Sequence, residues 1–358
     1  MLQCFIWTVF VLFFSFSSAQ QGFGVINNDW HVSLANQSLT QALKSFVSVL
    51  TRNRTILIVG GQNDKNVYQD GMLSMNLPTD VSNITRQAHF ISMSTSAIIP
   101  FGSNPHGYTY GIDPWANEEW LYIVSPKSSY NATQQRLWQY SITNNVWSSR
   151  TLSKPRRNTC VVYVAFSQQQ QYLYIIGGAI NDNNANDEWT ISNEMERYDL
   201  KKQKSERMSA MNVARSGHSC VYSTKQKAIY VLSGLDKSQN LTATMERYDI
   251  EGDEWSTVWN TTAQAPLAMY NPRALHASVL LESNDTADQI DIVSVGGRGP
   301  HDEPLSAVEI LSIVAVHNQS YVRSHASSLQ FPRSSLAVVS QANYAIFALG
   351  GSNTSSEY

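Results

Sequence analysis

Charged residues are scarce in this sequence, and neither sign dominates. Only 15% of the 358 residues are Asp, Glu, Lys or Arg, and the formal net charge is -3. Proteins that bind nucleic acid usually carry a marked basic excess, so we expect no nucleic-acid partner. The many Ser, Thr, Asn and Gln residues suit a β-rich surface of turns and short strands.

Cysteine and the motifs of common enzymes are also scarce or missing. The chain has three cysteines, which excludes a small disulfide-dense scaffold. It contains no Gly-x-Ser-x-Gly elbow, no His-Glu-x-x-His and no phosphate-binding glycine loop. The sequence therefore predicts no catalytic residue, no cofactor and no metal site.

Only the start of the chain holds a long apolar run. "FIWTVFVLFF" (Phe5–Phe14) is too short to span a bilayer and is followed by small residues up to Ala19. This pattern predicts a signal peptide over residues 1–19, cleaved before Gln20, and a secreted protein or the ectodomain of a surface protein. The segment before the run lacks Lys and Arg, so an uncleaved anchor is the alternative. A membrane would otherwise be involved only if an anchor followed the C-terminus.

An apolar run that ends in glycine recurs along the rest of the chain. The runs are "TILIVGG" to Gly61, "YLYIIGG" to Gly178, "AIYVLSG" to Gly234, "IDIVSVGG" to Gly297 and "YAIFALGG" to Gly351. "EWLYIVSP" (Glu119–Pro126) fills the gap between the first two, with Ser-Pro in place of the glycines. This gives six units roughly 54 to 64 residues apart, a period typical of propellers and arrays.

Each unit has the same interior of four short β-rich segments. A basic residue opens an apolar stretch, the glycine run follows, and then come a strand such as "MERYDL" and a Trp-bearing strand such as "GDEWSTVW" (Gly252–Trp259). Four such strands make one blade. The glycines suit a turn where φ is positive, and Tyr and Trp are large enough to fill the wedge between blades. The sequence predicts an all-β, six-bladed propeller of four-stranded antiparallel blades.

The motifs of these units resemble the kelch repeat. Met-Glu-Arg-Tyr-Asp occurs twice, at Met195–Asp199 and Met245–Asp249, after the glycine run and before the Trp strand. The resemblance covers nearly the whole mature chain and implies a member of the galactose oxidase central-domain-like superfamily. It is weaker in the second unit, which lacks the glycines, and in the fifth, where "SAVEILS" (Ser306–Ser312) has no Tyr or Trp.

The ends of the chain predict how the ring closes. The sixth unit stops at "SSEY" (Ser355–Tyr358), where its third strand is cut short and its fourth is missing. "NNDWHVSLAN" (Asn27–Asn36) resembles a fourth strand, so we expect this N-terminal strand to pair into the last blade. The sequence thus predicts a signal peptide over 1–19 and a propeller over 20–358 whose last blade is truncated, and this abrupt end suggests a fragment of a longer protein.

Basic residues recur at the start of the first strands. Aligning the units places Lys44, Arg86, Arg156, Arg215, Arg273 and Arg333 in one register. Two interpretations remain open. In one, each arginine pairs with a backbone carbonyl or an acidic residue, such as the Glu and Asp of "MERYD". In the other, these residues converge at the channel mouth and bind a carboxylate or phosphate. The resemblance supports the second, because some intracellular kelch adaptors hold acidic peptides with arginines in this register.

Other recurring residues have simpler interpretations. His89, His218 and His276 follow the arginines, and we expect hydrogen-bonded core histidines. Cys160 and Cys220 lie four and five residues after their arginines. An offset of one residue in a strand reverses the side chain, so free thiols rather than a disulfide are predicted.

Sequons for N-glycosylation support a secreted chain. They occur at Asn36, Asn53, Asn83, Asn131, Asn240, Asn260, Asn284, Asn318 and Asn353. The predicted function is a secreted or cell-surface recognition module that binds a protein or glycan, possibly acidic. The alternative is an enzyme acting on an acidic sugar in the channel, like a sugar-acid isomerase, or a copper oxidase. A structural extracellular protein is a third possibility.

Overall fold

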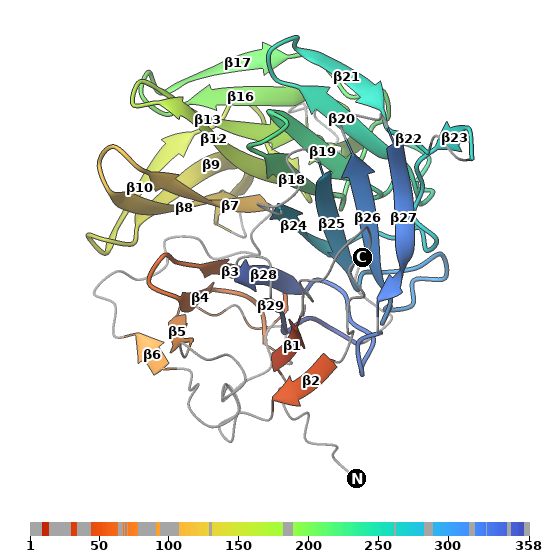
Figure 1. Cartoon of the computed structure of the whole chain (residues 1–358). Helices are drawn as coiled ribbons and strands as arrows, with labels where there is room; N and C mark the ends of the chain where they lie inside the picture. The colour runs from red at the N-terminus through yellow and green to blue at the C-terminus, as the bar shows by residue number, and fades with distance from the viewer. Residues whose placement is uncertain are drawn as a thin grey trace.

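The computed structural model describes most of the chain as β-strands joined by turns (Figure 1). The described residues are 9–13, 30–33, 44–63, 67, 69, 71–77, 91–93, 107–128, 131–181, 189–260, 263–282, 289–314, 319–326, 328–341 and 345–353. Within these ranges no helix is long and apolar enough to cross a membrane.

The described residues form six four-stranded antiparallel sheets. From the inner to the outer strand, the first is β3 (Val47–Leu50), β4 (Thr55–Val59), β5 (Met72–Asn76) and β6 (Ile91–Met93), and the second is β7 (Gly107–Asp113), β8 (Glu118–Ser128), β9 (Asn131–Ser141) and β10 (Val146–Thr151). The third is β12 (Cys160–Ser167), β13 (Gln170–Ile176), β16 (Met195–Asp199) and β17 (Lys204–Met208), and the fourth is β18 (Ser219–Ser223), β19 (Ala228–Leu232), β20 (Met245–Asp249) and β21 (Glu254–Thr257). The fifth is β24 (Ala277–Glu282), β25 (Gln289–Val295), β26 (Val308–Val314) and β27 (Gln319–Ala326), and the sixth is β28 (Ala337–Gln341), β29 (Ala345–Leu349), β1 (Val9–Phe13) and β2 (Trp30–Ser33).

The six sheets stand around a common centre and close into a ring. Their innermost strands contact one another in the order β3, β7, β12, β18, β24, β28 and back to β3, and Figure 1 shows the sheets radiating from these strands. Closure leaves the inner strands with only short edges, which face the centre of the ring and are protected there. The predicted all-β propeller is confirmed.

The N-terminal part of the chain completes the sixth sheet, as predicted. Trp30 begins the outermost strand, β2, which pairs with β1 through Leu12, and β1 in turn pairs with β29. The third strand comes from residues 9–13, whereas residues 355–358, expected there, lie outside the described residues. The predicted signal peptide over residues 1–19 thus includes a strand of this sheet, and its cleavage stays a prediction.

The hydrophobic core lies between neighbouring sheets. One cluster combines Val164 and Tyr174 of the third sheet with Val231 and Tyr248 of the fourth, all fully buried. Alternate residues of a strand point to opposite faces, so each sheet presents one apolar set to the sheet before it and another to the sheet after it. Burying such side chains stabilises the fold by about 1.5–3 kcal/mol each.

The glycines at the end of the second strands sit where backbones meet. Gly177 and Gly178 have φ of 57° and 84°. A Cβ at Gly177 would lie 2.7 Å from the Arg215 carbonyl oxygen of the next sheet, and one at Gly178 would lie 2.6 Å from the Arg157 carbonyl oxygen. A side chain therefore does not fit at either position. In the second sheet, where Ser-Pro replaces the glycines, β8 instead continues through Pro126 to Ser128.

Two small sheets accompany the ring. The first consists of β11 (Arg156–Arg157), β14 (Ala179–Ile180) and β15 (Thr190–Ile191), and it extends the third sheet beyond its glycines. The second is the hairpin of β22 (Trp259–Asn260) and β23 (Ala265–Pro266), between the fourth and fifth sheets.

A disulfide joins Cys160 to Cys220, so the prediction of free thiols is wrong. Their Cα atoms are 6.0 Å apart, and the bond links the inner strands β12 and β18. In a ring of sheets, the front face of one sheet packs against the rear face of the next. Two side chains that face each other across neighbouring sheets therefore occupy positions that differ by an odd number of residues when their strands are aligned. The one-residue offset between the cysteines meets this condition and permits the bond.

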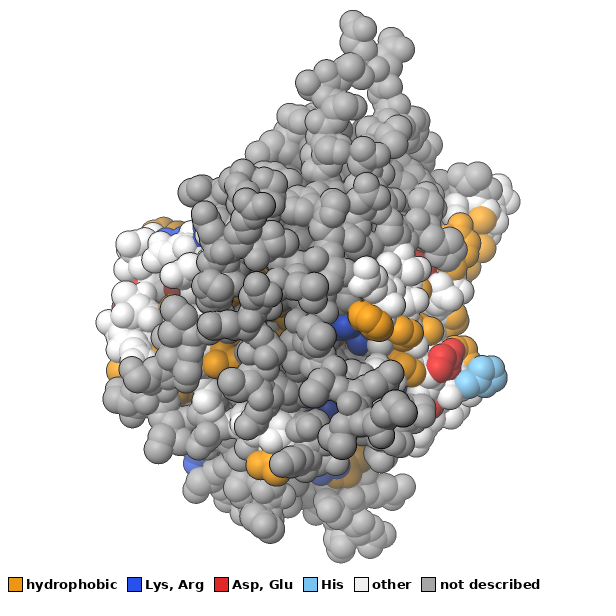
Figure 2. All heavy atoms as spheres, turned by 90° about the horizontal axis from the view of Figure 1, so that it is seen from below, with side chains coloured by type: hydrophobic (Ala, Val, Ile, Leu, Met, Phe, Trp, Pro, Cys, Tyr) orange, Lys and Arg blue, Asp and Glu red, His pale blue; other side chains and the backbone are white. Residues whose placement is uncertain are grey.

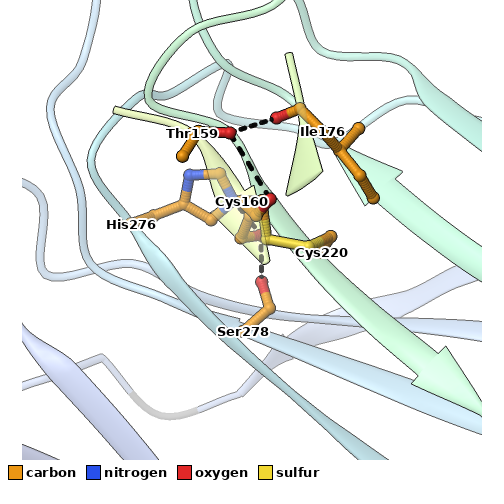
Figure 3. The surroundings of a disulfide bond; sticks show 7 residues. Thr159, Cys160, Ile176, Cys220, His276 and Ser278 are labelled. Atoms are coloured by element: carbon orange, nitrogen blue, oxygen red, sulfur yellow. Dashed lines mark hydrogen bonds between the residues drawn. A yellow bond between two sulfur atoms is a disulfide. The ribbon is translucent and has the colours of Figure 1, made fainter. Parts of the chain in front are cut away.

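The disulfide lies beside a small group of hydroxyl and imidazole side chains (Figure 3). Thr159 donates to the Ile176 carbonyl oxygen at 2.8 Å, which ties β12 to β13. Ser219, next to Cys220, is 2.7 Å from His276 Nε2 and 2.7 Å from Ser278 Oγ. These contacts join the fourth sheet to the fifth, so three successive sheets are connected here.

Replacing either cysteine by serine is expected to lower the free energy of unfolding by about 4 kcal/mol, because the bond closes a loop over a separation of 60 residues. Urea unfolding of Cys160→Ser, Cys220→Ser and the double variant measures this. Because both single variants remove the same bond, the double variant should lose little more than either one. Unfolding midpoints equal to wild type, without reductant, would show that the bond does not form.

Candidate functional site

The repeated Met-Glu-Arg-Tyr-Asp segment forms the third strand of two sheets. In β20, Met245, Glu246 and Tyr248 are each at most 1% exposed. The Tyr248 ring lies 5.1 Å from that of Trp255 and 5.9 Å from that of Tyr174 in the third sheet, so it fills the space between sheets as predicted.

The last residue of the segment closes the following hairpin. In the fourth sheet Asp249 accepts a hydrogen bond from the Gly252 backbone at 2.8 Å, and in the third sheet Asp199 accepts from the Lys201 and Lys202 backbones. Aspartate is favoured in such turns because its carboxylate accepts backbone hydrogen bonds from the residues that follow.

The glutamate of the segment pairs with the first-strand arginine. In the fourth sheet the Arg215 side chain is 0% exposed, and its Nη2 lies 3.1 Å from Glu246 Oε1. Its Nη1 donates to the carbonyl oxygens of Ser233 and Thr244 and to the Thr242 hydroxyl, each at 3.0 Å. The guanidinium thus bridges the end of the second strand and the start of the third.

The fifth sheet repeats this arrangement. Arg273, also 0% exposed, donates from Nη1 to the carbonyl oxygens of Gly296 at 3.0 Å and Ala307 at 2.9 Å, and from Nη2 to Glu309. "SAVEILS" therefore keeps the glutamate of the pattern although it lacks the aromatic residue.

The third sheet contains the same arginine–glutamate arrangement with longer contact distances. Arg156, 2% exposed, donates to the carbonyl oxygens of Gly177 at 3.0 Å and Glu194 at 3.3 Å. Its Nη2 lies 3.8 Å from Glu196 Oε2. Ser153 donates to the same carboxylate at 2.8 Å. In all three sheets the arginine therefore contacts at least two carbonyl oxygens and one carboxylate.

The same glutamates hold the loops that enter the sheets. Glu246 accepts from the backbones of Asn212 at 2.7 Å and Val213 at 3.1 Å, and Glu309 accepts from those of Tyr270 at 2.7 Å and Asn271 at 3.1 Å. Each carboxylate thus ties its entering loop to the third strand, and its buried oxygens gain several donors.

The arginine backbones connect the fourth, fifth and sixth sheets each to the sheet before it. The amides of Gly178, Gly234 and Gly297 donate to the carbonyl oxygens of Arg215, Arg273 and Arg333 at 2.7, 2.9 and 2.9 Å. The side chain of each of these arginines contacts its own sheet while its backbone contacts the previous sheet. The register found in the sequence is therefore a structural register of the ring.

The remaining predicted cations differ from one another. Arg333 is partly exposed and donates to the Gly350 carbonyl oxygen at 2.7 Å, and burial of its guanidinium lowers its pKa to about 10. Lys44 is buried, and burial and the nearby charge of Arg298 lower its pKa. Arg86 lies outside the described residues.

A cavity of about 540 Å³ occupies the centre of the ring and is lined by the inner strands. Among the described residues, none of the predicted cations and no other Lys, Arg, Asp or Glu lines it. The buried contacts of Arg156, Arg215 and Arg273 are those of the first interpretation, in which the arginines pair within the fold. These three guanidinium groups do not converge on this cavity.

The lining histidines His218 and His276 are buried and are kept neutral. Burial, and then the charge of Arg215, lower the pKa of His218 to about 3. Burial and the charge of Arg273 hold the pKa of His276 well below its ordinary value. His89 lies outside the described residues. The described lining is thus an uncharged wall of hydroxyl, imidazole and apolar groups.

Four predicted glycosylation sites have described side chains. Asn53, Asn240 and Asn353 are exposed and Asn260 is partly exposed. Asn131 begins β9, and Asn36, Asn83, Asn284 and Asn318 lie outside the described residues.

Some residues with clear chemical roles were missed in the sequence. Arg157, directly after a register arginine, stacks on Trp189, with its Cζ 3.9 Å from the ring centroid. Arg298 is 1% exposed and pairs with Asp302 at 2.8 Å. The doubled "RR" at Arg156 and Arg157 was a visible signal, but the partner side chains come from loops that no repeat aligns.

Glu246→Gln is expected to lower the free energy of unfolding by about 3–5 kcal/mol, because it leaves the buried Arg215 guanidinium without its carboxylate. Urea unfolding measures the loss. Glu251→Gln is the matched control, since it breaks an exposed pair with Lys227 and such pairs contribute little. A loss for Glu246→Gln no greater than that of the control would contradict the structural role of the pair.

Acidification is expected to destabilise the fold below about pH 6.5, the ordinary pKa of histidine. His218 has a pKa near 3 in the folded chain, so between these values the unfolded chain binds a proton that the folded chain does not. Stability is complete above this window and falls by up to about 1.4 kcal/mol per pH unit within it. Urea unfolding of wild type and His218→Gln at pH 7 and pH 5 tests this. Equal pH dependence in both proteins would refute it.

Comparisons with known proteins agree with the geometry. The family model described as the Attractin/LZTR1 beta-propeller matches residues 127–303. A RING finger domain and kelch repeat-containing protein of Dictyostelium discoideum is 27% identical over 128 residues, and this region spans 35% of the chain but only 12% of that relative. The solved structure of YjhT superposes with a TM-score of 0.62 at 12% identity, covering 88% of this chain and 92% of that one. With the ring of sheets, these findings identify the fold as a kelch-type β-propeller.

Proposed function

We propose that this chain is a secreted or cell-surface kelch propeller that acts as a recognition module for a protein or glycan ligand. Kelch propellers commonly serve as protein-interaction modules. The observation that carries the proposal is the uncharged lining of the central cavity among the described residues. An enzyme acting on an acidic sugar would hold the substrate carboxylate with a cation, and the described lining contains no Lys or Arg, whereas recognition through loops needs none in the channel.

Three features support a place in the secretory pathway. Disulfides such as Cys160–Cys220 persist mainly in oxidising compartments. The sequons at Asn53, Asn240 and Asn353 are exposed, as acceptors must be. The N-terminal apolar run has the length of a signal peptide.

Cleavage after Ala19 would also remove β1 from the sixth sheet. The mature chain would then need another strand beside β29, because β29 is flanked by β28 and β1. The N-terminus of the protein made by cells therefore decides whether this sheet is built as described here.

The test begins with expression in a eukaryotic secretory host. We expect the chain in the medium, starting at Gln20 and losing mass after enzymatic removal of N-glycans. Retention inside cells, or a chain that keeps residues 1–19 and carries no glycan, would contradict the extracellular role.

The secreted chain is then screened against arrays of extracellular protein domains and glycans, and assayed for turnover of acidic sugars. The recognition role predicts saturable binding to a member of an array without turnover. Turnover of an acidic sugar would favour an enzyme and refute the recognition role, as would the absence of binding on both arrays.

A further inference from the structure

The third strand of the sixth sheet comes from an unusual part of the chain. It is β1, residues 9–13, in which Phe10 pairs with Ala348 of β29 and Leu12 pairs with Ile346. In the other five sheets the third strand follows the second strand along the chain. Cleavage before Gln20, which is part of the proposed function, would remove β1 and leave β29 with a free edge. A free edge readily takes up another strand.

The connection from the second to the third strand has the same length in three sheets. In the first, fourth and fifth sheets, the carbonyl oxygen of the last glycine accepts from the amide eight residues later, at 2.8 to 2.9 Å; these pairs are Gln69 with Gly61, Thr242 with Gly234 and Leu305 with Gly297. The third strand then begins eleven residues after the glycine, at Met72, Met245 and Val308. The third sheet has a longer connection, from Gly178 to Met195.

The sixth sheet starts this connection in the same way. Ser352 and Ser334 exchange two backbone hydrogen bonds of 2.8 Å, and the first, fourth and fifth sheets have an equivalent bridge directly after the glycine. A connection of the same length after Gly351 would place the first residue of the third strand at position 362. That position lies beyond Tyr358, the last residue of the sequence.

An arginine before the inner strand is matched by a glutamate in the third strand. The arginine stands four residues before the inner strand begins, and the glutamate pairs with the next-to-last residue of the second strand. The third, fourth and fifth sheets have both, as Arg156 and Glu196, Arg215 and Glu246, and Arg273 and Glu309. The equivalent residues are Leu43 and Leu73 in the first sheet and Ser103 and Trp138 in the second. The glutamate thus occurs only where the arginine does.

The sixth sheet has the arginine of this pair. Arg333 stands four residues before β28 and donates to the Gly350 carbonyl oxygen at 2.7 Å. The equivalent contacts at the end of the second strand are made by Arg156, Arg215 and Arg273. Opposite Ala348, where the pattern calls for glutamate, stands Phe10. β1 therefore supplies a strand but not the glutamate of the pattern.

The loop that enters the sixth sheet has the backbone amides that bind the glutamate elsewhere. In the fourth and fifth sheets, the glutamate accepts from the amides three and two residues before the arginine. The equivalent residues here are Gln330 and Phe331, both exposed. Figure 2 views the molecule from the side of β1 and β2 and shows apolar side chains of the described residues at the surface beside basic ones. A glutamate in the third strand would therefore find the same donors in this sheet.

We propose that in the cleaved protein the edge of β29 binds a strand of the same polypeptide that begins at position 362, C-terminal to Tyr358, and carries glutamate at position 363. This glutamate would pair with Arg333 and accept from the amides of Gln330 and Phe331. β1 marks the place of this strand, and β2 would stay outermost. The inference rests on the proposed cleavage before Gln20 and names what replaces the strand that cleavage removes.

Two observations favour a strand of the same chain over one from another molecule. The connection after Gly351 begins as it does in three complete sheets, so the chain is already directed as it is before a third strand. A strand on the same chain is also present at a high effective concentration, whereas a second molecule must be captured from solution.

The test uses secreted chains that start at Gln20 behind a signal peptide of the host. One chain ends at Tyr358. A second continues with a copy of Thr242–Asp253, which places the copied Met245 and Glu246 at positions 362 and 363. A third carries one extra glycine before this copy. Because a one-residue shift turns every side chain of a strand to the opposite face, we expect the second chain to have the highest urea midpoint and the third to lose most of the increase.

The predicted ion pair is tested in the second chain. Replacing the copied Glu246 by Gln should increase the unfolding equilibrium constant at least about tenfold, because a charge-assisted hydrogen bond is lost. In the Arg333→Gln background the same replacement should change the constant less than about twofold. Arg207→Gln is the matched control, since it alters a 74% exposed arginine of the third sheet and should leave the tenfold effect in place.

Several results would overturn the inference. They include equal midpoints for the in-register and shifted copies, and a glutamate replacement with the same effect with and without Arg333. If the chain that ends at Tyr358 does not fold, the two extended chains still give the comparison. Sequencing the natural transcript is a second measurement: we expect a glutamate codon at position 363, and a stop codon after Tyr358 or a residue that is not acidic at that position would refute the proposal.

Failure here can be told from failure of the proposed function. The test chains start at Gln20 by design, so the comparison of registers does not depend on the natural signal. A natural protein that keeps residues 1–19 would refute the cleavage on which both proposals rest. Equal midpoints of the extended chains, together with binding on the protein or glycan arrays, would overturn the strand and leave the recognition role standing.

Discussion

A guanidinium group that is removed from water must be surrounded by acceptors, and this requirement organises the sheets of the propeller. Arg215 and Arg273 are fully buried, and each finds two carbonyl oxygens and one glutamate within its own sheet. The carbonyls are left free where the second strand ends and the third begins. The arginine therefore donates hydrogen bonds to the carbonyl oxygens that are left free at the glycine turn, and the glutamate neutralises the charge of its guanidinium.

The same contacts extend from one sheet to the next. The glutamates bind the backbone of the entering loops, and the glycine amides bind the carbonyl oxygens of the arginines in the following sheet. These contacts tie the third, fourth, fifth and sixth sheets together in a common register. The charged groups are used in this framework, and the described wall of the central cavity contains none of them. The recognition role that we propose would therefore use the loops outside the channel.

The disulfide and the stacking of Arg157 on Trp189 show where reasoning from the sequence was incomplete. The offset between Cys160 and Cys220 was counted correctly, but its consequence depends on whether two strands lie in one sheet or in two facing sheets. For facing sheets, opposite parity brings side chains together. Arg157 and Trp189 are separated by more than thirty residues of sequence, and only the pairing of β11, β14 and β15 brings them together.

The sequence alone determined the all-β propeller fold and the order of strands within its units, because strand periodicity, glycine turns and repeated motifs are local properties of the chain. Only the tertiary structure showed that residues 9–13 supply the strand beside β29. The sequence also placed the arginines in one register. Only the tertiary structure decided where these side chains point, since a strand residue can face the channel, a neighbouring sheet or its own sheet. That choice depends on which carbonyls and carboxylates the folded chain leaves within reach.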